Sequence, residues 1–243
     1  MGFVLQACLN GAREPGSHPN LPITPDQLAA AAADCAELGV ASFHLHPRDV
    51  LGREVLAGPE VATSVAVVRA AVPHAEIGVT TGAWIVPDPA RRADLVRGWA
   101  VLAAGRPDFA SVNVHEDGWL DTAAALREAG VGVELGVFHE RAARALLDHG
   151  LPPGVVRVLA EVQPGEGVAH ADLLLDLLVP LGAPVLLHGE DDSAWPVFDH
   201  AVARGFDTRV GLEDTLVDRA GAPAVDNAAL VASAAGKPGG VGR

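Results

Sequence analysis

The sequence predicts an α/β protein that forms a single (β/α)8 barrel, the TIM barrel fold. Apolar runs of strand length alternate with longer segments rich in alanine and leucine along the 243 residues. Eight such units follow one another with short connections, which favours parallel strands joined by right-handed crossovers. Eight units in a chain of this length are typical of a closed barrel. The alternative, an open doubly wound sheet, is disfavoured because no Gly-x-Gly-x-x-Gly pattern follows the first strand.

The eight predicted strands are apolar runs that end in polar residues. In a barrel of this kind the polar residues at the C-terminal strand ends carry the chemistry. The predicted strands cover residues 3–9, 40–46, 77–81, 109–114, 132–138, 155–162, 184–188 and 208–212.

Helix start signals lie between the predicted strands. Thr24 is suited to cap a helix that begins at Pro25, because proline fits the first helical position. Gly58-Pro59 and Asp88-Pro89 predict the second and third helices in the same way. The other five helices are expected to begin near Asp121, His139, His170, Ala194 and Asp226, and four helices are expected to end at Gly39, Gly130, Gly150 and Gly205.

The whole chain, residues 1–243, is expected to be one barrel domain, since no internal repeat or second domain is visible. Residues from about 237 to 243 are rich in glycine and proline and are expected to form a flexible tail. The only lysine, Lys237, lies in this tail. Schiff-base aldolase chemistry is therefore disfavoured, because it needs a lysine inside the pocket.

Composition limits the partners and the compartment. A formal charge of −14 predicts repulsion from nucleic acids and anionic membranes, so neither is an expected partner. No apolar run has membrane-spanning length, and no basic segment precedes an apolar stretch at the N-terminus. Cys8 and Cys35 show neither metal-type spacing nor a disulfide framework. A reducing cytoplasm is the expected location.

Two histidines and a distant glutamate predict a divalent-metal site. His44 and His46 are two residues apart at the end of the second predicted strand, so their side chains share one face. Glu213 follows the eighth strand, and even-numbered barrel strands contribute side chains to the same layer. Three such ligands leave a coordination position open, as in catalytic sites. The alternative is a pair of hydrogen-bonded histidines with no metal.

Two charged residues each allow more than one interpretation. Glu134 lies within an apolar run, where it is either part of the site or a structural partner of Arg157 or Arg209. Arg209 forms either a salt bridge with a structural role, or it serves the site as an anion clamp or as a guanidinium that tunes Asp214.

Other strand-end residues are weaker candidates. Ser111 and Asn113 share one face and either bind ligand oxygens or line the barrel, and Thr80 and Thr81 either face the site or simply favour strand structure. Residues 190–192, Glu-Asp-Asp, are expected to form a solvated loop, with a second cation site as the alternative. Further candidates, each with a structural role as the alternative, are Trp84, Trp195, His18, His115, His139 and His188.

At these residues the chain resembles the β-keto acid cleavage enzyme family over nearly its whole length. The resemblance is carried by motifs that occur in the family's order. These are Asn10-Gly11-Ala12, residues 20–25, His44-Leu45-His46-Pro47-Arg48-Asp49, Thr80-Thr81-Gly82, Ser111-Val112-Asn113, Glu134 with Phe138, and Val210-Gly211-Leu212-Glu213-Asp214.

The resemblance implies a barrel that binds zinc through His44, His46 and Glu213. It also implies a reaction in which a β-keto acid and acetyl-CoA give acetoacetate and a new CoA thioester by a retro-Claisen route. An Asp214–Arg209 dyad is expected to take the substrate proton, with Glu134 as a further catalytic residue. Glu14, Thr80, Thr81, Ser111 and Asn113 are expected to shape the substrate pocket. A homo-oligomer, with a tetramer favoured, is also implied.

The chain departs from the family's pattern after strands six and seven. Acidic residues such as Glu161, Glu166 and Glu190 stand where glycine-rich and arginine-rich turns are expected, in loops that help to build the CoA side of the pocket. Zinc use is therefore better supported than CoA use. A zinc-dependent lyase or hydrolase without CoA is the first alternative, and a non-catalytic metal-binding barrel is the second.

Overall fold

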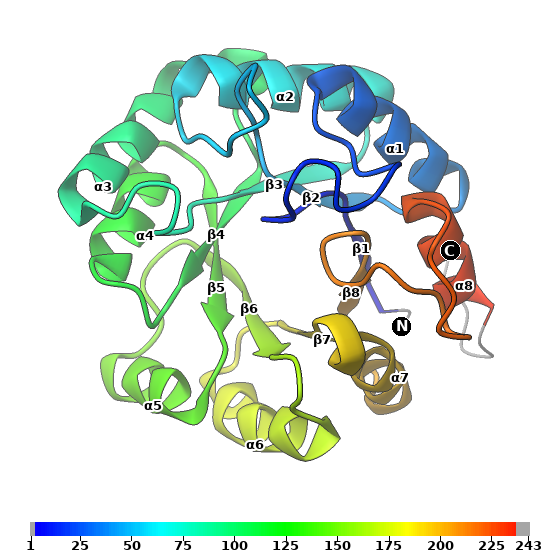
Figure 1. Cartoon of the computed structure of the whole chain (residues 1–243). Coiled ribbons are helices and arrows are strands. Elements are labelled where there is room, and N and C mark those ends of the chain that lie inside the picture. The colour runs from blue at the N-terminus through cyan, green and yellow to red at the C-terminus, as the bar shows by residue number, and fades with distance from the viewer. Residues whose placement is uncertain (1–2, 237–243) are drawn as a thin grey trace.

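Eight parallel strands surround a central axis, and helices cover the outside of the strands (Figure 1). The computed structural model describes residues 3–236. Neighbouring strands follow the order β7-β6-β5-β4-β3-β2-β1-β8. The barrel closes between β7 and β8 through a parallel bridge of Leu186 with Asp207, where Leu187 N donates to Asp207 O at 2.9 Å. The predicted (β/α)8 fold is confirmed, and the predicted tail at residues 237–243 lies outside the described residues.

All eight predicted strands are present, most of them one to three residues shorter than predicted. Their bounds are β1 Leu5–Cys8, β2 Ser42–Leu45, β3 Glu76–Thr80, β4 Phe109–Asn113, β5 Gly132–Val137, β6 Val155–Val162, β7 Val185–Gly189 and β8 Thr208–Val210.

The eight main helices alternate with the strands. Their bounds are α1 Pro25–Glu37, α2 Gly58–Ala71, α3 Pro89–Arg97, α4 Trp119–Glu128, α5 Glu140–His149, α6 Val168–Leu178, α7 Ala194–Arg204 and α8 Asn227–Ala235. Short 3-10 helices are η1 Gly98–Val101, η2 Ala103–Gly105, η3 Val179–Leu181 and η4 Asp191–Ser193.

Side-chain caps fix several helix starts where the sequence predicts them. The Thr24 hydroxyl accepts from Gln27 N, and the Gln27 side chain accepts from Thr24 N, which completes a capping box. Asp88, His139 and Asp226 cap α3, α5 and α8 with their side chains. These caps satisfy backbone N–H groups that the first helical turn leaves free.

Alternation along the strands separates the core from the site. In β2, Phe43 and Leu45 are fully buried in the apolar core, while His44 and the residue after Leu45, His46, point into the barrel. No described helix is long and apolar enough to cross a membrane.

Candidate metal centre and active site

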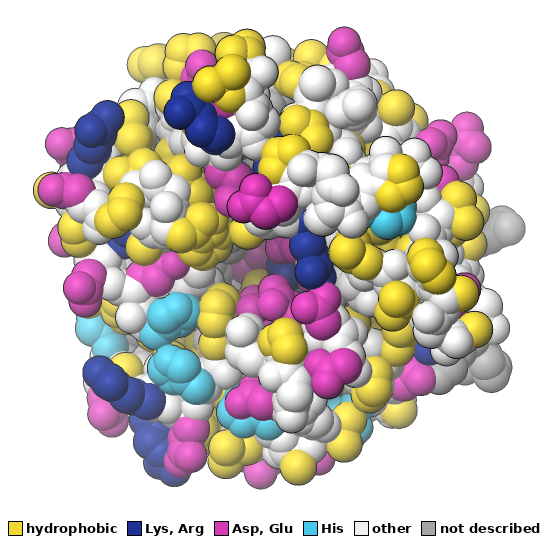
Figure 2. All heavy atoms as spheres, viewed as in Figure 1, with side chains coloured by type: hydrophobic (Ala, Val, Ile, Leu, Met, Phe, Trp, Pro, Cys, Tyr) yellow, Lys and Arg dark blue, Asp and Glu magenta, His cyan; other side chains and the backbone are white. Residues whose placement is uncertain are grey.

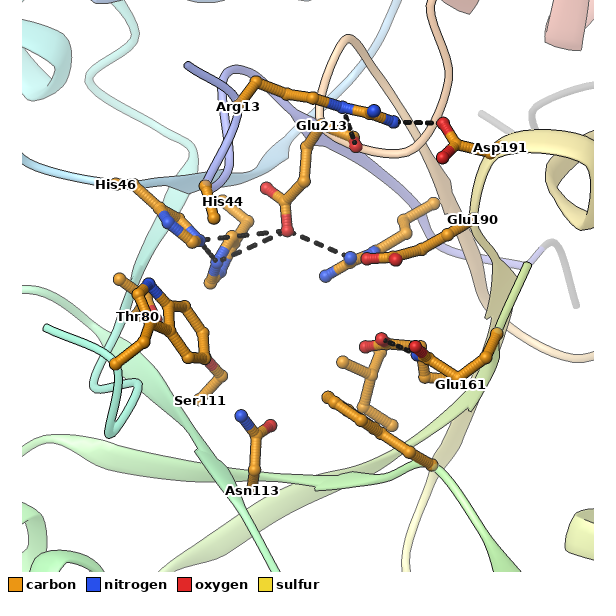
Figure 3. A pocket seen from close by; sticks show the side chains of 16 residues that line it. Arg13, His44, His46, Thr80, Ser111, Asn113, Glu161, Glu190, Asp191 and Glu213 are labelled. Atoms are coloured by element: carbon orange, nitrogen blue, oxygen red, sulfur yellow. Dashed lines mark hydrogen bonds and ion pairs between the residues drawn. The ribbon is translucent and has the colours of Figure 1, made fainter. Parts of the chain in front are cut away.

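A cavity of about 360 Å³ opens at the C-terminal ends of the strands, where the sequence predicts the site. Figure 2 shows a hollow at the centre of this face, surrounded largely by acidic side chains and with a basic group at its edge. Figure 3 shows labelled side chains from both halves of the barrel reaching toward the middle of the cavity.

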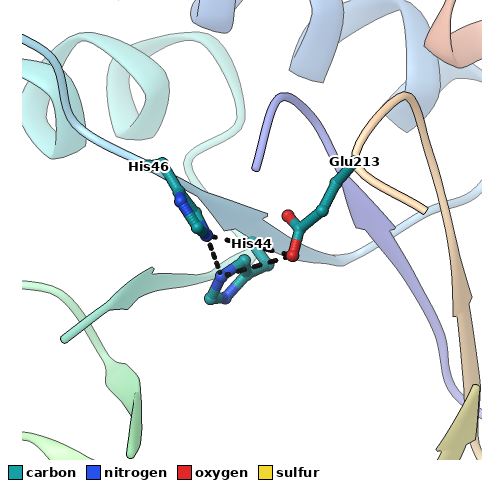
Figure 4. Close-up of side chains that lie close together, drawn as sticks. All are labelled: His44, His46 and Glu213. Atoms are coloured by element: carbon teal, nitrogen blue, oxygen red, sulfur yellow. Dashed lines mark hydrogen bonds and ion pairs between the residues drawn. The ribbon is translucent and has the colours of Figure 1, made fainter. Parts of the chain in front are cut away.

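The three predicted metal ligands meet at one side of this cavity (Figure 4). The Nε2 atoms of His44 and His46 are 3.2 Å apart, and Glu213 Oε1 lies 4.0 Å and 3.9 Å from them. Strands β2 and β8 flank β1 in the barrel, so ligands about 170 residues apart in the chain become neighbours. Among the described residues, this is the one group of three His, Cys, Asp or Glu side chains with the closeness of a metal site.

The two histidine nitrogens have the spacing of ligands on a tetrahedral zinc ion, while Glu213 Oε1, at 4.0 and 3.9 Å from them, lies farther away than a bound oxygen would. Zinc–nitrogen bonds of 2.0–2.1 Å at a tetrahedral angle place two nitrogens roughly 3.3 Å apart, close to the 3.2 Å between His44 and His46. Glu213 Oε2 is buried and has no hydrogen-bond partner among the described residues, so it is free to act as a ligand. Burial, and then the neighbouring His46, lower the pKa of His44 well below its usual value, which favours the neutral form that can bind a metal.

A second layer of contacts orients His46. Its Nδ1 lies 2.5 Å from Glu54 Oε1, and Trp84 Nε1 donates to Glu54 Oε2 at 3.0 Å. Metal-binding histidines commonly hold a carboxylate through the second ring nitrogen, which leaves Nε2 for the metal. Asn10 fixes the backbone of His46, because its Nδ2 donates to His46 O and its Oδ1 accepts from His46 N.

Glycine makes room for the distant carboxylate. Gly11 has a φ of +56°, and a Cβ atom there would lie 2.4 Å from Glu213 Cγ. A side chain at this position would therefore displace Glu213 as well as strain the backbone. Gly211 allows a second close approach, because a Cβ atom there would lie 1.9 Å from Cys8 O.

Glu213 belongs to a network of buried charged side chains at the cavity. Arg209 Nη2 donates to Glu213 Oε1 at 3.0 Å, and its Nε donates to Asp214 Oδ1 at 2.9 Å. His188 connects Asp214 with Glu161 in this network. Its Nδ1 lies 3.4 Å from Asp214 Oδ1, and its Nε2 lies 3.3 Å from Glu161 Oε2. The salt-bridge interpretation of Arg209 is therefore confirmed, and its guanidinium also lines the cavity.

Burial and ion pairing set the protonation states of Asp214 and His188. Burial raises the pKa of Asp214, but Arg209 and then His188 outweigh it and hold that pKa below its usual range. Burial and Arg209 lower the pKa of His188, but hydrogen bonds to Asp214 and Glu161 raise it to about 9. Asp214 is therefore ionised and His188 protonated at neutral pH.

The predicted substrate-binding residues divide into two groups. Thr80, Ser111 and Asn113 line the cavity. Thr81 does not line it and instead donates from Oγ1 to Ser111 O at 2.6 Å. Glu14 is exposed and lines a second cavity of about 320 Å³, which shares Arg13 and Trp84 with the first.

Glu134 is fully buried inside the barrel and does not line the cavity. Its Oε2 lies 2.9 Å from Arg157 Nε, which confirms the structural pairing that the sequence left open. Burial raises its pKa, with Arg157 opposing. The catalytic role of Glu134 stays a prediction, because the residue does not line the cavity.

The sequence analysis did not assign several cavity residues. Asp191 and Asp192 are exposed, as expected of a solvated loop, and Glu190 and Asp191 also line the cavity. Arg13 reaches across to Asp191 at 2.5 Å and donates from Nε to Glu213 O at 3.1 Å. Glu161 lies at the end of β6, where the strand-end rule alone could have selected it. Phe138, Leu159 and Gln163 complete this region of the lining.

The whole described barrel matches one known family. The sequence profile of the beta-keto acid cleavage enzymes matches residues 3–243. The chain belongs to the beta-keto acid cleavage enzyme family. The family resemblance predicted from the motifs is therefore confirmed.

Solved structures share the fold at low sequence identity. Ligand-free ObcA has a TM-score of 0.65 and 19% identity, covering 88% of this chain and 60% of its own. ObcA with oxaloacetate has a TM-score of 0.65, 17% identity, and coverage of 88% and 62%. A type I 3-dehydroquinate dehydratase from Clostridium difficile has a TM-score of 0.61, 11% identity, and coverage of 91% and 86%. The present chain thus spans 60–62% of the length of the ObcA chains.

Proposed function

We propose that this protein is a zinc-dependent β-keto acid cleavage enzyme. It would convert a β-keto acid and acetyl-CoA into acetoacetate and a new acyl-CoA, which makes it an acyltransferase that cleaves a carbon–carbon bond. The observation that carries the proposal is the convergence of His44, His46 and Glu213 at the cavity of a chain that belongs to this family.

The residues have separate roles in this proposal. His44, His46 and Glu213 would hold the ion, and a bound zinc ion supplies Lewis acidity at a carbonyl oxygen. Arg209 presents a guanidinium to the cavity, where it stabilises negative charge on an enolate or carboxylate oxygen. Asp214 belongs to the same dyad and fixes that guanidinium from behind.

Polar residues on the opposite wall would orient the substrate. Thr80, Ser111 and Asn113 offer hydroxyl and amide groups to ligand oxygens. Thr81 would act through the backbone of Ser111, and Glu134 through Arg157. Glu14 would reach only a substrate group that extends past Trp84 into the adjoining cavity.

Ligands of related structures support the substrate classes. ObcA binds oxaloacetate in one structure and a C4-CoA adduct with oxalate in another. We extend keto acid and CoA use to this chain within the proposal. The competing function is a zinc-dependent lyase or hydrolase without CoA, which the acidic residues Glu161, Glu190 and Asp191 favour because they repel phosphates.

Product analysis separates the two functions. Purified protein with zinc is incubated with a panel of β-keto acids, with and without acetyl-CoA. Acetoacetate and a new acyl-CoA are expected only when acetyl-CoA is present. Consumption of the keto acid at the same rate without acetyl-CoA would identify the lyase or hydrolase instead.

We further propose a cytoplasmic homo-oligomer, a tetramer by family resemblance, with no nucleic acid or membrane partner. Light scattering of the purified protein tests the assembly. A mass equal to that of one 24.9 kDa chain would contradict it.

A further inference from the structure

The second cavity, which shares Arg13 and Trp84 with the cavity at the metal site, has the opposite charge. Among the residues that the structure describes, four carboxylates and two guanidinium groups line the first cavity, a formal charge of −2 with neutral histidines. The second cavity has two carboxylates and three guanidinium groups in its lining, a formal charge of +1. These are Glu14 and Glu54 with Arg13, Arg48 and Arg53. A negatively charged group of a reactant is therefore better accommodated in the second cavity.

Arg48 brings a buried positive charge to the second cavity. The residue is 6% exposed, and its guanidinium donates only to backbone carbonyl oxygens. The acceptors are Gly52 O and Gly11 O, both at 2.8 Å, and Arg13 O at 2.6 Å. Within residues 3–236 this guanidinium forms no ion pair, and its buried Nε has no hydrogen-bond partner. Because a buried charge without a counterion is costly, an anion in the cavity would offset that cost.

Arg13 is the cation that a bound group can reach from either cavity. Its side chain is 23% exposed, its Nε donates to Glu213 O at 3.1 Å, and its Nη2 pairs with Asp191 Oδ1. Figure 3 shows Arg13 extending over Glu213 toward Asp191. In the described part of the chain, Nη1 of Arg13 has no hydrogen-bond partner. Since Nε holds the backbone of a candidate metal ligand, an anion bound to this guanidinium would lie next to the metal site.

The pair of Arg13 with Asp191 is a weak competitor for such an anion. The Asp191 side chain is 48% exposed, and ion pairs with this exposure contribute little because water screens them. A carboxylate or phosphate group binds a guanidinium more firmly when it accepts two parallel hydrogen bonds. Trp84 and Leu51, which are 50% and 70% exposed, add apolar surface to the same cavity. The second cavity therefore fits an anionic group attached to an apolar segment.

We propose that the second cavity is a subsite for a negatively charged group of a reactant, and that Arg13 recognises this group. The group is either a carboxylate at the far end of the β-keto acid or a phosphate of CoA, since both present paired oxygens to a guanidinium. In the first case Arg13 selects keto acids with a second carboxylate. In the second case the phosphates bind outside the acidic first cavity. This subsite rests on the proposed function, because both reactants come from it.

Calorimetric titration of the zinc-loaded protein distinguishes the two sources. The ligand pairs are 3-oxoadipate with 3-oxohexanoate, which lacks the second carboxylate, and CoA with pantetheine, which lacks the phosphates. In one pair, the ligand with the additional anionic group should bind about 10–100-fold more tightly, the range of a charge-assisted hydrogen bond. Arg13→Gln should bring this ratio close to one. Arg91→Gln removes the same charge from an exposed position on α3, outside both cavity linings, and serves as the control.

Two further measurements separate recognition from a structural role of Arg13. Asp191→Asn removes the competing carboxylate, so the preferred ligand should bind up to about fivefold more tightly, in line with the small contribution of a half-exposed ion pair. A purely structural pair would give unchanged or weaker binding in this variant. Elemental analysis of Arg13→Gln should show the zinc content of the wild type, which excludes loss of the metal site as the cause of weaker binding.

The outcomes that would overturn the subsite differ from those that would refute the proposed function. Equal affinity within both ligand pairs would exclude the subsite, and so would a preference that survives in Arg13→Gln; either result leaves acetoacetate formation untouched. A wild-type enzyme that forms no acetoacetate from any β-keto acid would refute the proposed function, whereas the binding ratios would still report on the subsite.

Discussion

Replacement of His188 by glutamine is expected to change how the stability of the protein depends on pH. The imidazole is 1% exposed and lies between Asp214 and Glu161. Burial and the charge of Arg209 lower its pKa, and the two carboxylates outweigh them and raise it to about 9, from an ordinary value of 6.5. The folded protein therefore holds this proton more tightly than the unfolded chain does.

The size of the effect follows from this difference. Each tenfold change in proton affinity corresponds to about 1.36 kcal/mol, so the protonated ring contributes about 3 kcal/mol to the free energy of unfolding. Because the folded pKa is raised, the contribution is fully present below pH 6.5 and is lost as the pH rises through 9. At roughly 2–4 °C per kcal/mol for a chain of this size, it corresponds to about 6–12 °C in Tm.

Thermal unfolding at several pH values measures this contribution. The Tm of His188→Gln is compared with that of the wild type at pH 6, 7.5 and 9.5, in metal-loaded and in chelator-treated protein. The deficit of the variant should shrink by about 6–12 °C from pH 6 to pH 9.5, because the wild type loses the proton that the variant never binds. His74→Gln removes an exposed imidazole before β3 and controls for the loss of one histidine. A deficit that stays constant over this range, or grows with pH, would refute the reasoning.

Three further predictions concern the cavity. His46→Ala should lower the zinc content well below one ion per chain by elemental analysis and abolish turnover, and full zinc content would exclude this histidine as a ligand. Arg209→Lys should lower kcat/KM on the order of 10²-fold, because a single ammonium cannot reproduce the guanidinium contacts to Glu213 and Asp214; near-native kinetics would contradict the dyad. Gly11→Ala should cost about 1–2 kcal/mol of backbone strain and also weaken zinc binding, since the new methyl group would displace Glu213; unchanged zinc affinity by competition with a chelator would argue against the role of Gly11.

Local signals in the sequence were sufficient for the fold. Asp88, His139 and Asp226 were predicted near helix starts and do cap α3, α5 and α8. These signals act over three or four residues and do not depend on the rest of the chain. α4 and α6 begin two residues before the predicted Asp121 and His170, because Gly118 and Gly167 precede them without a side-chain cap that the sequence could reveal.

The site was only partly predictable from the sequence. Some of its residues follow from strand periodicity and barrel symmetry, whereas others are placed by loops whose conformation the sequence pattern does not reveal. His44 and His46 follow from strand periodicity, and Glu213 follows from barrel symmetry. Glu54 holds His46 from the loop between β2 and α2, and no periodic pattern connects the two residues. Glu190 required knowledge of how the loop after β7 turns, which is set by the contacts of its backbone with Val162 and Ser193.

From the charges of the cavity we expect a bound divalent ion to favour the binding of an anionic substrate. Among the described residues, its lining carries four carboxylates, Glu161, Glu190, Asp191 and Glu213, against the two guanidinium groups of Arg13 and Arg209. With neutral histidines the lining therefore has a formal charge of −2, which repels a keto acid carboxylate. A divalent ion in the triad would cancel this charge, and a proton on Glu190 would make the cavity positive by one. Substrate binding, metal binding and protonation of Glu190 are thus expected to be coupled through the same electrostatic field.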